Sequence, residues 1–188
     1  MIEIRWHARG GQGAVTASKI LASSAIREGK YAQSAPDYGA ERAGAPLRSF
    51  NRVSEKPITL HCLVLHPDIV VVVDPTLLKT VPILEGTSDD AVLVINTDKT
   101  PAEIRSALNI KGRKIYTVNA SAIAMEEFGK PFMNVPMLGA LVKVIENLVS
   151  LDSVKEDIKA TFGKKVSGEL LEANLRALER AYREVKGE

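Results

Sequence analysis

The residues most suited to bind a ligand form a glycine-rich stretch between a short apolar run and a long helical pattern. They are Arg9, Gly10, Gly11, Gln12 and Gly13. A strand that ends in glycines and passes directly into a helix presents bare backbone N–H groups and the positive end of the helix dipole, which favour a phosphate or a carboxylate. The motif is partial, because Thr16 stands where a dinucleotide fingerprint has glycine or alanine, and no Gly-Lys-Ser or Gly-Lys-Thr follows. A tight turn that binds no ligand is equally compatible with this pattern.

A second group of polar residues lies in the segment from Ser34 to Pro46, whose glycine, proline and alanine content predicts an ordered loop. Asp37 and Glu41 in this loop have the residue types of an acid–base pair. Loop carboxylates beside an arginine, here Arg42, are more often structural ion pairs, so both interpretations stay open.

Motifs for catalysis are otherwise missing from the sequence. It has no G-x-S-x-G nucleophile elbow, no pair of histidines spaced for a helical metal site and no cysteine in a nucleophile setting. His7 lies within the first predicted strand, where we expect a core or edge histidine rather than a catalytic one. The single cysteine, Cys62, excludes an internal disulfide, a cysteine-built zinc site and an iron–sulfur cluster held by this chain alone. The sequence therefore predicts no catalytic residue and no metal ligand.

Length and charge narrow the class of protein. A chain of 188 residues with 45% hydrophobic residues is long enough for one sizeable core, so we expect a single domain over residues 1–188. The 25 basic and 23 acidic residues leave a net charge of +2, which is too small for a dedicated nucleic-acid surface. No apolar stretch reaches the roughly 20 residues of a membrane span, and no signal peptide is evident. We expect a cytoplasmic protein that binds neither nucleic acid nor membrane.

The elements that must position the glycine-rich turn alternate between strand and helix. Strands are predicted over residues 2–8, 31–35, 47–53, 68–74, 91–95 and 114–118. Helices are predicted to begin at Gln12, at Asp74-Pro75, at the capping box Thr100-x-x-Glu103 and at Asn119. This alternation predicts a three-layer α/β/α fold with a mostly parallel sheet over about residues 1–150, and places the turn at the carboxyl edge of that sheet.

The last third of the chain is predicted to be helical. Residues 137–149 are apolar on more than one side, which indicates burial between two surfaces, as at a subunit interface. Ser153 and Ser167 are predicted to cap the helices of a C-terminal extension over residues 151–188. The last helix has apolar residues at spacings of three and four, and docking on its own domain and docking on a partner both stay open.

Five motifs occur in order along residues 1 to about 150. They are Arg9-Gly-Gly-Gln-Gly13, Asp37-Tyr-Gly-Ala-Glu-Arg-Ala-Gly44, Leu47-Arg-Ser-Phe-Asn-Arg-Val53, Pro67-Asp-Ile-Val-Val71 and Met137-Leu-Gly-Ala140. Together they resemble the gamma subunits of 2-oxoacid:ferredoxin oxidoreductases, and within that family the chain is most similar to the gamma subunit of the four-subunit pyruvate enzyme. In the second motif Ala40 stands where the family usually has proline, and Ala43 and Ala45 flank the later glycine, so the resemblance does not imply the backbone path there.

The resemblance implies a function as well as a fold. It implies a non-catalytic gamma subunit of a pyruvate:ferredoxin oxidoreductase, assembled with alpha, beta and delta subunits that hold thiamine diphosphate and the iron–sulfur clusters. Such a complex decarboxylates pyruvate oxidatively to acetyl-CoA and passes the electrons to ferredoxin. The gamma subunit is associated with coenzyme A in this family, which makes coenzyme A the implied ligand. The residues implied at this contact are Arg9, Gly10, Gly11, Gln12, Gly13, Tyr38, Glu41 and Arg42.

The physical chemistry of these residues is compatible with coenzyme A as the ligand, but other ligands and functions also fit. The 3′-phosphorylated ADP moiety is strongly negative and suits an amide-lined turn flanked by Arg9 and Arg42, and Tyr38 has the flat ring needed to stack on adenine. Arg48 and Arg52 are equally well interpreted as solvated surface charges. NAD is the main rival ligand, but the acidic residue it needs at the end of the second strand is absent. Also open are a gamma subunit for 2-oxoisovalerate, 2-oxoglutarate or indolepyruvate, a subunit contact in place of a ligand, and a free-standing anion-binding or regulatory protein.

Overall fold

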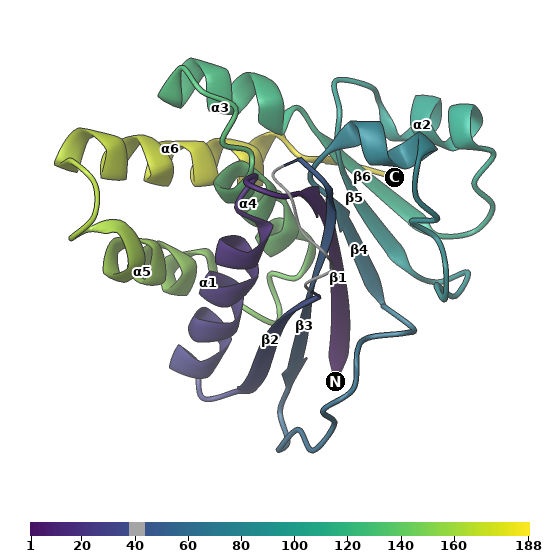
Figure 1. Ribbon diagram of the computed structural model, residues 1–188, viewed down its shortest axis with the longest axis horizontal. Coiled ribbons are helices and arrows are strands. Elements are labelled where there is room, and N and C mark those ends of the chain that lie inside the picture. The colour runs from purple at the N-terminus through teal and green to yellow at the C-terminus, as the bar shows by residue number, and fades with distance from the viewer. Residues whose placement is uncertain (38–43) are drawn as a thin grey trace.

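The computed structural model describes residues 1–37 and 44–188. Within these residues seven strands form one sheet in the order β2-β3-β1-β4-β5-β6-β7 (Figure 1). The strands are β1 (Ile2–Arg9), β2 (Tyr31–Asp37), β3 (Pro46–Ser54), β4 (Ile69–Val72), β5 (Val92–Asn96), β6 (Lys114–Val118) and β7 (Lys186–Gly187). The helices are α1 (Ala14–Arg27), α2 (Pro101–Leu108), α3 (Ala120–Phe128), α4 (Asn134–Val144), α5 (Leu151–Phe162) and α6 (Gly168–Glu184), with a 3₁₀ helix η1 (Pro75–Lys79).

The centre of the sheet is parallel and its margins are antiparallel. Strands β1, β4, β5 and β6 run in the same direction, whereas β3 and β7 run against their neighbours. Strand β2 pairs antiparallel with β3 and therefore runs with β1. The predicted α/β fold is confirmed, and most strands share one direction, with antiparallel pairing at both edges of the sheet.

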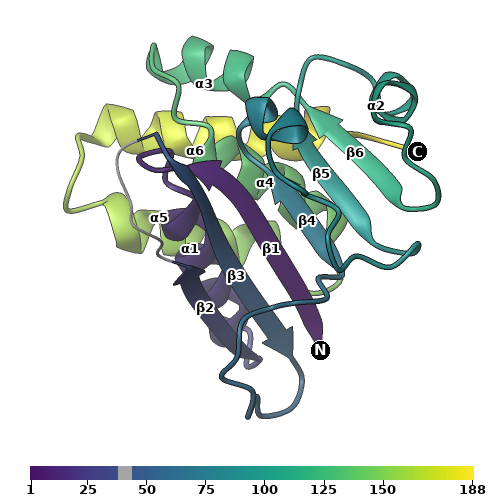
Figure 2. The ribbon, with the colours of Figure 1, turned by 45° about the vertical axis from the view of Figure 1, so that its right-hand side comes forward.

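The parallel register brings the carboxyl ends of β1, β4 and β5 to one edge of the sheet. His7 of β1 lies opposite Val72 of β4, and Val72 lies opposite Ile95 of β5. Figure 2 shows these strands side by side. Because the chain leaves β1 at Arg9 and enters α1 at Ala14, the glycine-rich turn lies at this carboxyl edge, as predicted.

The two faces of the sheet are covered unequally. One face packs against α1, α3, α4, α5 and α6 through a large core that includes Trp6, Val71 and Leu141. The other face has a smaller core over β4, β5 and β6, closed by Ile83 and by Ile104 of α2. On that second face, none of the described α-helices packs on β1, β2 or β3. We call this side of the three strands, which faces away from α1, the open half-face.

The apolar helix α4 is buried by the chain itself. Helix α6 packs along its outer side (Figure 1), and a β-carbon at Gly139 would overlap the carbonyl oxygen of Leu178 in α6. One side of α4 is thus buried against the core on the sheet, and the other side is buried against α6. The interpretation of this surface as a subunit interface is therefore wrong, and the last helix docks on its own chain.

Two predicted boundaries are also wrong. Strand β2 continues through Pro36, where the sequence predicts a loop, because an edge strand with one neighbour tolerates the missing N–H of proline. Helix α5 is capped by Ser150 and not by Ser153. The Glu28 carboxylate at the end of α1 accepts hydrogen bonds from both the N–H and the hydroxyl of Ser150, so a tertiary contact sets where α5 begins.

The remaining predicted caps are found where expected. Thr100 and Glu103 make both bonds of the capping box of α2, Asn119 caps α3 and Ser167 caps α6. Asp74 caps only the short η1. Among the helices in residues 1–37 and 44–188, none has the length and apolar character needed to cross a membrane.

Candidate functional site

The glycine turn, residues 9–13, is tied to the chain that leads into β3. Gly10 donates its N–H to the carbonyl oxygen of Ala45 at 2.9 Å, and Gly44 donates to the carbonyl oxygen of Gly10 at 3.1 Å. Gly11 and Gly13 have φ angles of 93° and 77°, in the region that favours glycine because it has no β-carbon. The glycines are therefore required by the backbone path of the turn.

Two side chains brace this turn against the end of β4. Gln12 accepts the backbone N–H of Arg9 on Oε1 at 2.7 Å and donates from Nε2 to Oδ2 of Asp74 at 2.6 Å. The Arg9 guanidinium donates to the Thr76 hydroxyl at 2.8 Å from Nη2 and to the Gly44 carbonyl oxygen at 3.0 Å, and its Nε lies 3.3 Å from Oδ2 of Asp74. Both side chains are thus engaged within the protein.

Asp74 is the anchor of these contacts. It is the N-cap of η1, and its Oδ1 accepts the N–H of Thr76 at 2.9 Å. Burial opposes its negative charge, but donors from Thr76 and Gln12 and the positive charge of Arg9 lower its pKa below the ordinary value. The carboxylate therefore stays ionised and balances Arg9. The sequence indicates only a helix cap at Asp74. Its contact with the glycine turn could have been inferred from its position at the end of β4, the parallel strand next to β1.

The N-terminus of α1 faces this turn without a side-chain cap. Gly13 is the N-cap and has no side chain to satisfy the first N–H groups of this 14-residue helix. The helix dipole adds a partial positive charge at the same place. A β-carbon at Gly11 would meet no atom within 4 Å, whereas one at Gly13 would lie 2.7 Å from Nδ2 of Asn134. One side of the turn is therefore open, and the start of α4 closes the other.

A groove of about 260 Å³ leads from the turn toward α5 and α6. It is lined by Gly11, Gln12, Gly13, Phe132, Asn134, Phe162, Val166, Leu170 and Asn174. Most of this lining is apolar, apart from two asparagines and one glutamine. The arrangement suits a ligand whose anionic end meets the N–H groups of α1 and whose less polar part lies in the groove.

The structure brings together five of the eight residues predicted at the ligand contact. These are Arg9, Gly10, Gly11, Gln12 and Gly13. The other three, Tyr38, Glu41 and Arg42, lie outside the described residues. Of the two further arginines considered, Arg48 pairs with Asp37 at 2.7 Å and Arg52 pairs with Glu3 at 2.6 Å. Arg52 is buried in its ion pair, so the interpretation as a solvated surface charge is wrong for Arg52, whereas Arg48 is exposed at the surface and fits it.

His7 is a buried strand histidine, as predicted. Its Nε2 accepts a hydrogen bond from Nε of Arg5 at 3.0 Å. Burial, followed by the positive charges of Arg5 and Arg48, lowers the pKa of His7 to about 3. The ring is therefore neutral at physiological pH and serves as a hydrogen-bond acceptor for Arg5.

The chain matches a known protein family over residues 3–184, and that family is described as pyruvate ferredoxin/flavodoxin oxidoreductase. The pyruvate synthase subunit PorC of Thermotoga maritima is 48% identical over 98% of this chain and 94% of its own length. A crystal structure of pyruvate oxidoreductase subunit PORC from the same organism superimposes with a TM-score of 0.86 at 44% identity, covering 99% of this chain and 97% of that one.

Two further likenesses differ in strength. The common gamma subunit of the pyruvate and ketoisovalerate oxidoreductases of Thermococcus kodakarensis is 48% identical over 97% of this chain and 96% of its own length. The 2-oxoglutarate:ferredoxin oxidoreductase of Magnetococcus marinus, solved with 2-oxoglutarate, coenzyme A and succinyl-CoA bound, has a TM-score of 0.76 at 22% identity, with 97% of this chain matching 30% of that one, and this shows a shared fold alone. By its near end-to-end identity with PorC and gamma subunits, the chain belongs to the pyruvate ferredoxin/flavodoxin oxidoreductase family, as a non-catalytic gamma-type subunit of an oxidoreductase complex.

Proposed function

We propose that this chain assembles with alpha, beta and delta subunits into a cytoplasmic pyruvate:ferredoxin oxidoreductase. In this proposal the partner subunits hold thiamine diphosphate and the iron–sulfur clusters, and ferredoxin takes the electrons. The observation that carries the proposal is the 48% identity with a PorC subunit over 98% of the chain. Co-purification with a thiamine-binding chain and a ferredoxin-like chain tests it, and a chain that stays monomeric in the presence of both partners contradicts it.

The glycine turn supplies a contact to coenzyme A in this proposal. The phosphates of the 3′-phosphorylated ADP moiety need donors and positive potential, and the uncapped N-terminus of α1 supplies both at Gly13. The open side of Gly11 leaves room for a close approach of the ligand to the backbone. Arg9 and Gln12 hold the turn in shape through Asp74, and Tyr38, Glu41 and Arg42 complete the proposed contact.

The variant Gly11→Val tests the contact, and the chain offers a matched control. Gly29, at the other end of α1, also has a positive φ, of 79°, and open space around a β-carbon. Valine at either position brings similar backbone strain, but only Gly11→Val adds a side chain where the ligand is proposed to bind. In the reconstituted complex we expect Gly11→Val to raise the KM for coenzyme A by about tenfold or more and Gly29→Val to leave it unchanged, with the KM for pyruvate unaffected by either. Equal effects of the two variants on coenzyme A would contradict the assignment.

A second variant separates a ligand contact from a subunit contact. If Arg42 contacts the ligand as proposed, Arg42→Ala is expected to remove a charge-assisted hydrogen bond of about 1.5–3 kcal/mol, equivalent to a rise of roughly 10- to 150-fold in the KM for coenzyme A. The same change leaves the 2-oxoacid constant nearly unchanged. If Arg42→Ala instead dissociates the complex and spares coenzyme A kinetics in what remains assembled, the residue belongs to an interface and its ligand assignment is wrong.

A second candidate function is that of a gamma subunit shared by two oxidoreductase complexes, one for pyruvate and one for 2-oxoisovalerate. The 48% identity with a gamma subunit common to pyruvate and ketoisovalerate oxidoreductases favours it. Affinity purification of the tagged chain from its own cells, with and without a gene for the pyruvate-specific alpha subunit, decides the point. Retention of 2-oxoisovalerate oxidation in the material purified without that subunit supports a shared role, and its loss limits the chain to one complex.

A further inference from the structure

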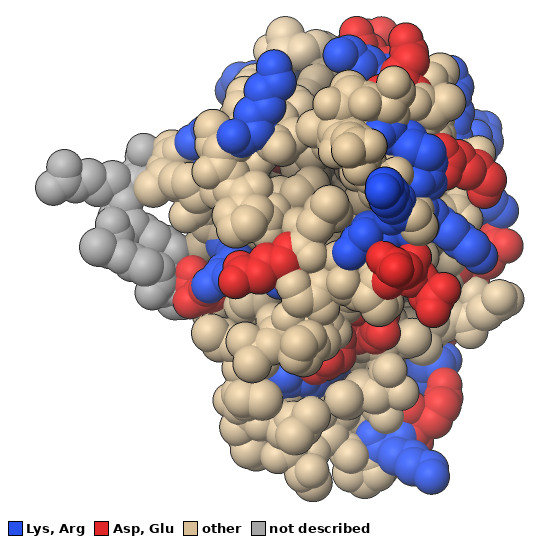
Figure 3. Space-filling view, turned by 90° about the vertical axis from the view of Figure 1, so that its right-hand side faces the viewer, with Lys and Arg blue, Asp and Glu red and all other residues tan. Residues whose placement is uncertain are grey.

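A pocket of about 430 Å³ opens on the open half-face and shares no lining residue with the groove beside Gly11. Charged and polar side chains of β1 and β3 form one wall, and apolar residues of η1 and the chain after it form another. Its lining includes Arg5, His7 and Arg48 and the carboxylates of Asp37 and Glu85, with Leu77, Val81 and Pro82 on the apolar side. Figure 3 shows the side of the molecule that faces away from α1, where acidic and basic side chains are interspersed over the surface.

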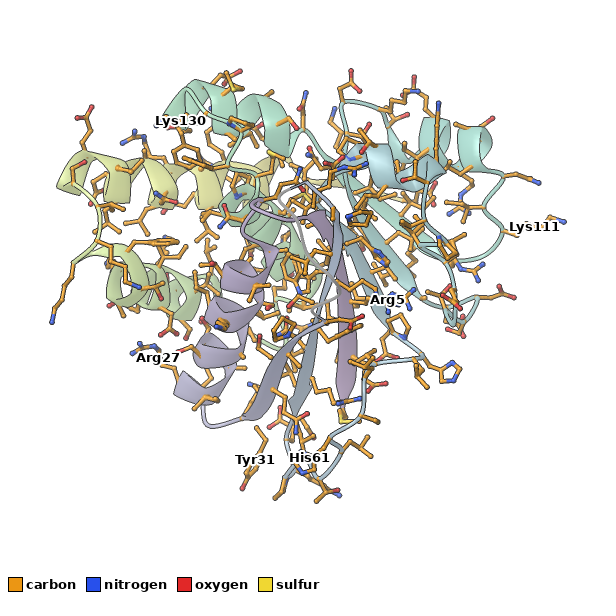
Figure 4. The ribbon with its side chains drawn as sticks, viewed as in Figure 1. Arg5, Arg27, Tyr31, His61, Lys111 and Lys130 are labelled. Carbon is orange, nitrogen blue, oxygen red and sulfur yellow. The ribbon has the colours of Figure 1, made fainter. Side chains whose placement is uncertain are left out.

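Arg5 is a buried cation with an unusual set of partners. The residue is 3% exposed, and Figure 4 shows it beside β1 on the side away from α1. Its Nη2 donates to the carbonyl oxygens of Ile83 at 2.9 Å and Glu85 at 2.7 Å, and its Nε donates to His7. Among the described residues, no carboxylate lies within 4 Å of this guanidinium, and Nη1 donates to none of them. A buried charge without a counter-ion is costly, so such a group ordinarily meets a carboxylate or a phosphate.

The neighbours of Arg5 keep its free end available. His7 accepts from Nε with a neutral ring, so it orients the guanidinium without adding a charge. Arg48 is already paired with Asp37 through Nη2 and Oδ2 at 2.7 Å. Glu85 attracts the Arg5 charge only from beyond 4 Å. Among the described residues, therefore, no carboxylate oxygen bonds to Nη1 of Arg5, which lies beside a pocket large enough for a small organic molecule.

We propose that this pocket binds a small organic anion, with a carboxylate or phosphate on Nη1 of Arg5 and an apolar body against Leu77 and Val81. The guanidinium provides the charge-assisted hydrogen bonds that such an oxygen takes. The apolar wall favours a ligand that carries carbon as well as charge. This site is separate from the coenzyme A contact proposed at Gly11, and it does not depend on that proposal.

Titration of the full chain by calorimetry tests the site with three probes. 3-Phenylpropionate and phenyl phosphate carry the two anionic groups on one apolar ring, and 3-phenylpropanamide is the neutral counterpart of the first. We expect both anions to bind and the amide to bind at least about tenfold more weakly, because it lacks the charge that Arg5 meets. The tighter of the two anions identifies whether the natural group is a carboxylate or a phosphate.

Three variants make the result decisive. Arg5→Gln removes the charge and is expected to weaken both anions by about tenfold or more while leaving the amide unchanged. Val81→Trp, at a partly exposed position on the rim, fills the pocket without touching the buried arginine and is expected to abolish binding of all three probes. Gly29→Val, at the other end of α1, is the control and is expected to leave the affinity for all three probes unchanged. Equal affinity for amide and anions, wild-type affinity in Val81→Trp, or a Kd weaker than about 10 mM for both anions overturns the proposal.

Discussion

His7 makes the stability of this chain depend on pH in a range where its carboxylates contribute little. Its side chain is buried, and burial followed by the charges of Arg5 and Arg48 lowers its pKa to about 3. In the unfolded chain the ring returns to its ordinary pKa of 6.5. Between these two pH values the His7 ring is protonated in the unfolded state and neutral in the folded state. The contribution of His7 to stability is therefore present in full above about pH 6.5 and is lost as the pH falls toward 3.

The size of this effect follows from the two pKa values. Between pH 7.5 and 5.0 the unfolded ring gains nearly one proton and the folded ring stays neutral, which lowers the free energy of unfolding by about 2 kcal/mol. Asp74 and Asp157 have lowered pKa values despite their burial, because hydrogen bonds stabilise their carboxylates. Their stabilisation is present above their unfolded pKa values near 4 and is lost only below them, so a comparison that stops at pH 5.0 isolates the histidine.

Urea unfolding of the wild type and of His7→Gln at pH 7.5 and 5.0 measures the effect. Glutamine cannot titrate, and its amide oxygen still accepts the N–H of Arg5. We expect the wild type to lose about 2 kcal/mol between the two pH values and His7→Gln to lose little. The control is a double variant, His61→Gln with His66→Gln, because both of these rings are exposed. If the double variant removes the pH dependence and His7→Gln keeps it, the buried neutral ring is not its cause.

Three further predictions concern packing and caps, each measured by urea unfolding. Gly139→Ala is expected to destabilise the fold by about 2–3 kcal/mol although alanine favours helices, because its β-carbon meets the Leu178 carbonyl; an unchanged midpoint contradicts this close approach. Asn51→Ala is expected to cost about 2–4 kcal/mol, since Asn51 accepts the indole N–H of Trp6 at 2.9 Å in the buried core; a loss below 1 kcal/mol, roughly, shows that water replaces it. Ser167→Ala removes the cap of α6 and is expected to cost about 1 kcal/mol, whereas no change means that the cap is dispensable.

Features that depend on contacts between residues close in the chain could be predicted from the amino-acid sequence. Asn119 and Ser167 cap helices where predicted, because a capping side chain bonds to N–H groups two or three residues away. The glycine turn lies at the predicted carboxyl edge of the sheet, because the chain passes directly from β1 into α1. Strand direction follows from the alternation of strand and helix, since a crossover helix returns the chain to the same edge.

Contacts between segments far apart in the chain could not be predicted and are seen only in the folded protein. Gln12 donates a hydrogen bond to Asp74, which is 62 residues away in the chain. The residues next to Gln12 therefore do not reveal whether its side chain supports the turn or is available to bind a ligand. The apolar pattern of α4 shows that it is buried but does not say by what, because the same side chains suit a partner subunit or helix α6. The charge on Arg5 has no sequence signal either. Its significance comes from burial beside a pocket, which depends on the chain after η1 that places the carbonyl oxygens of Ile83 and Glu85 on this side chain.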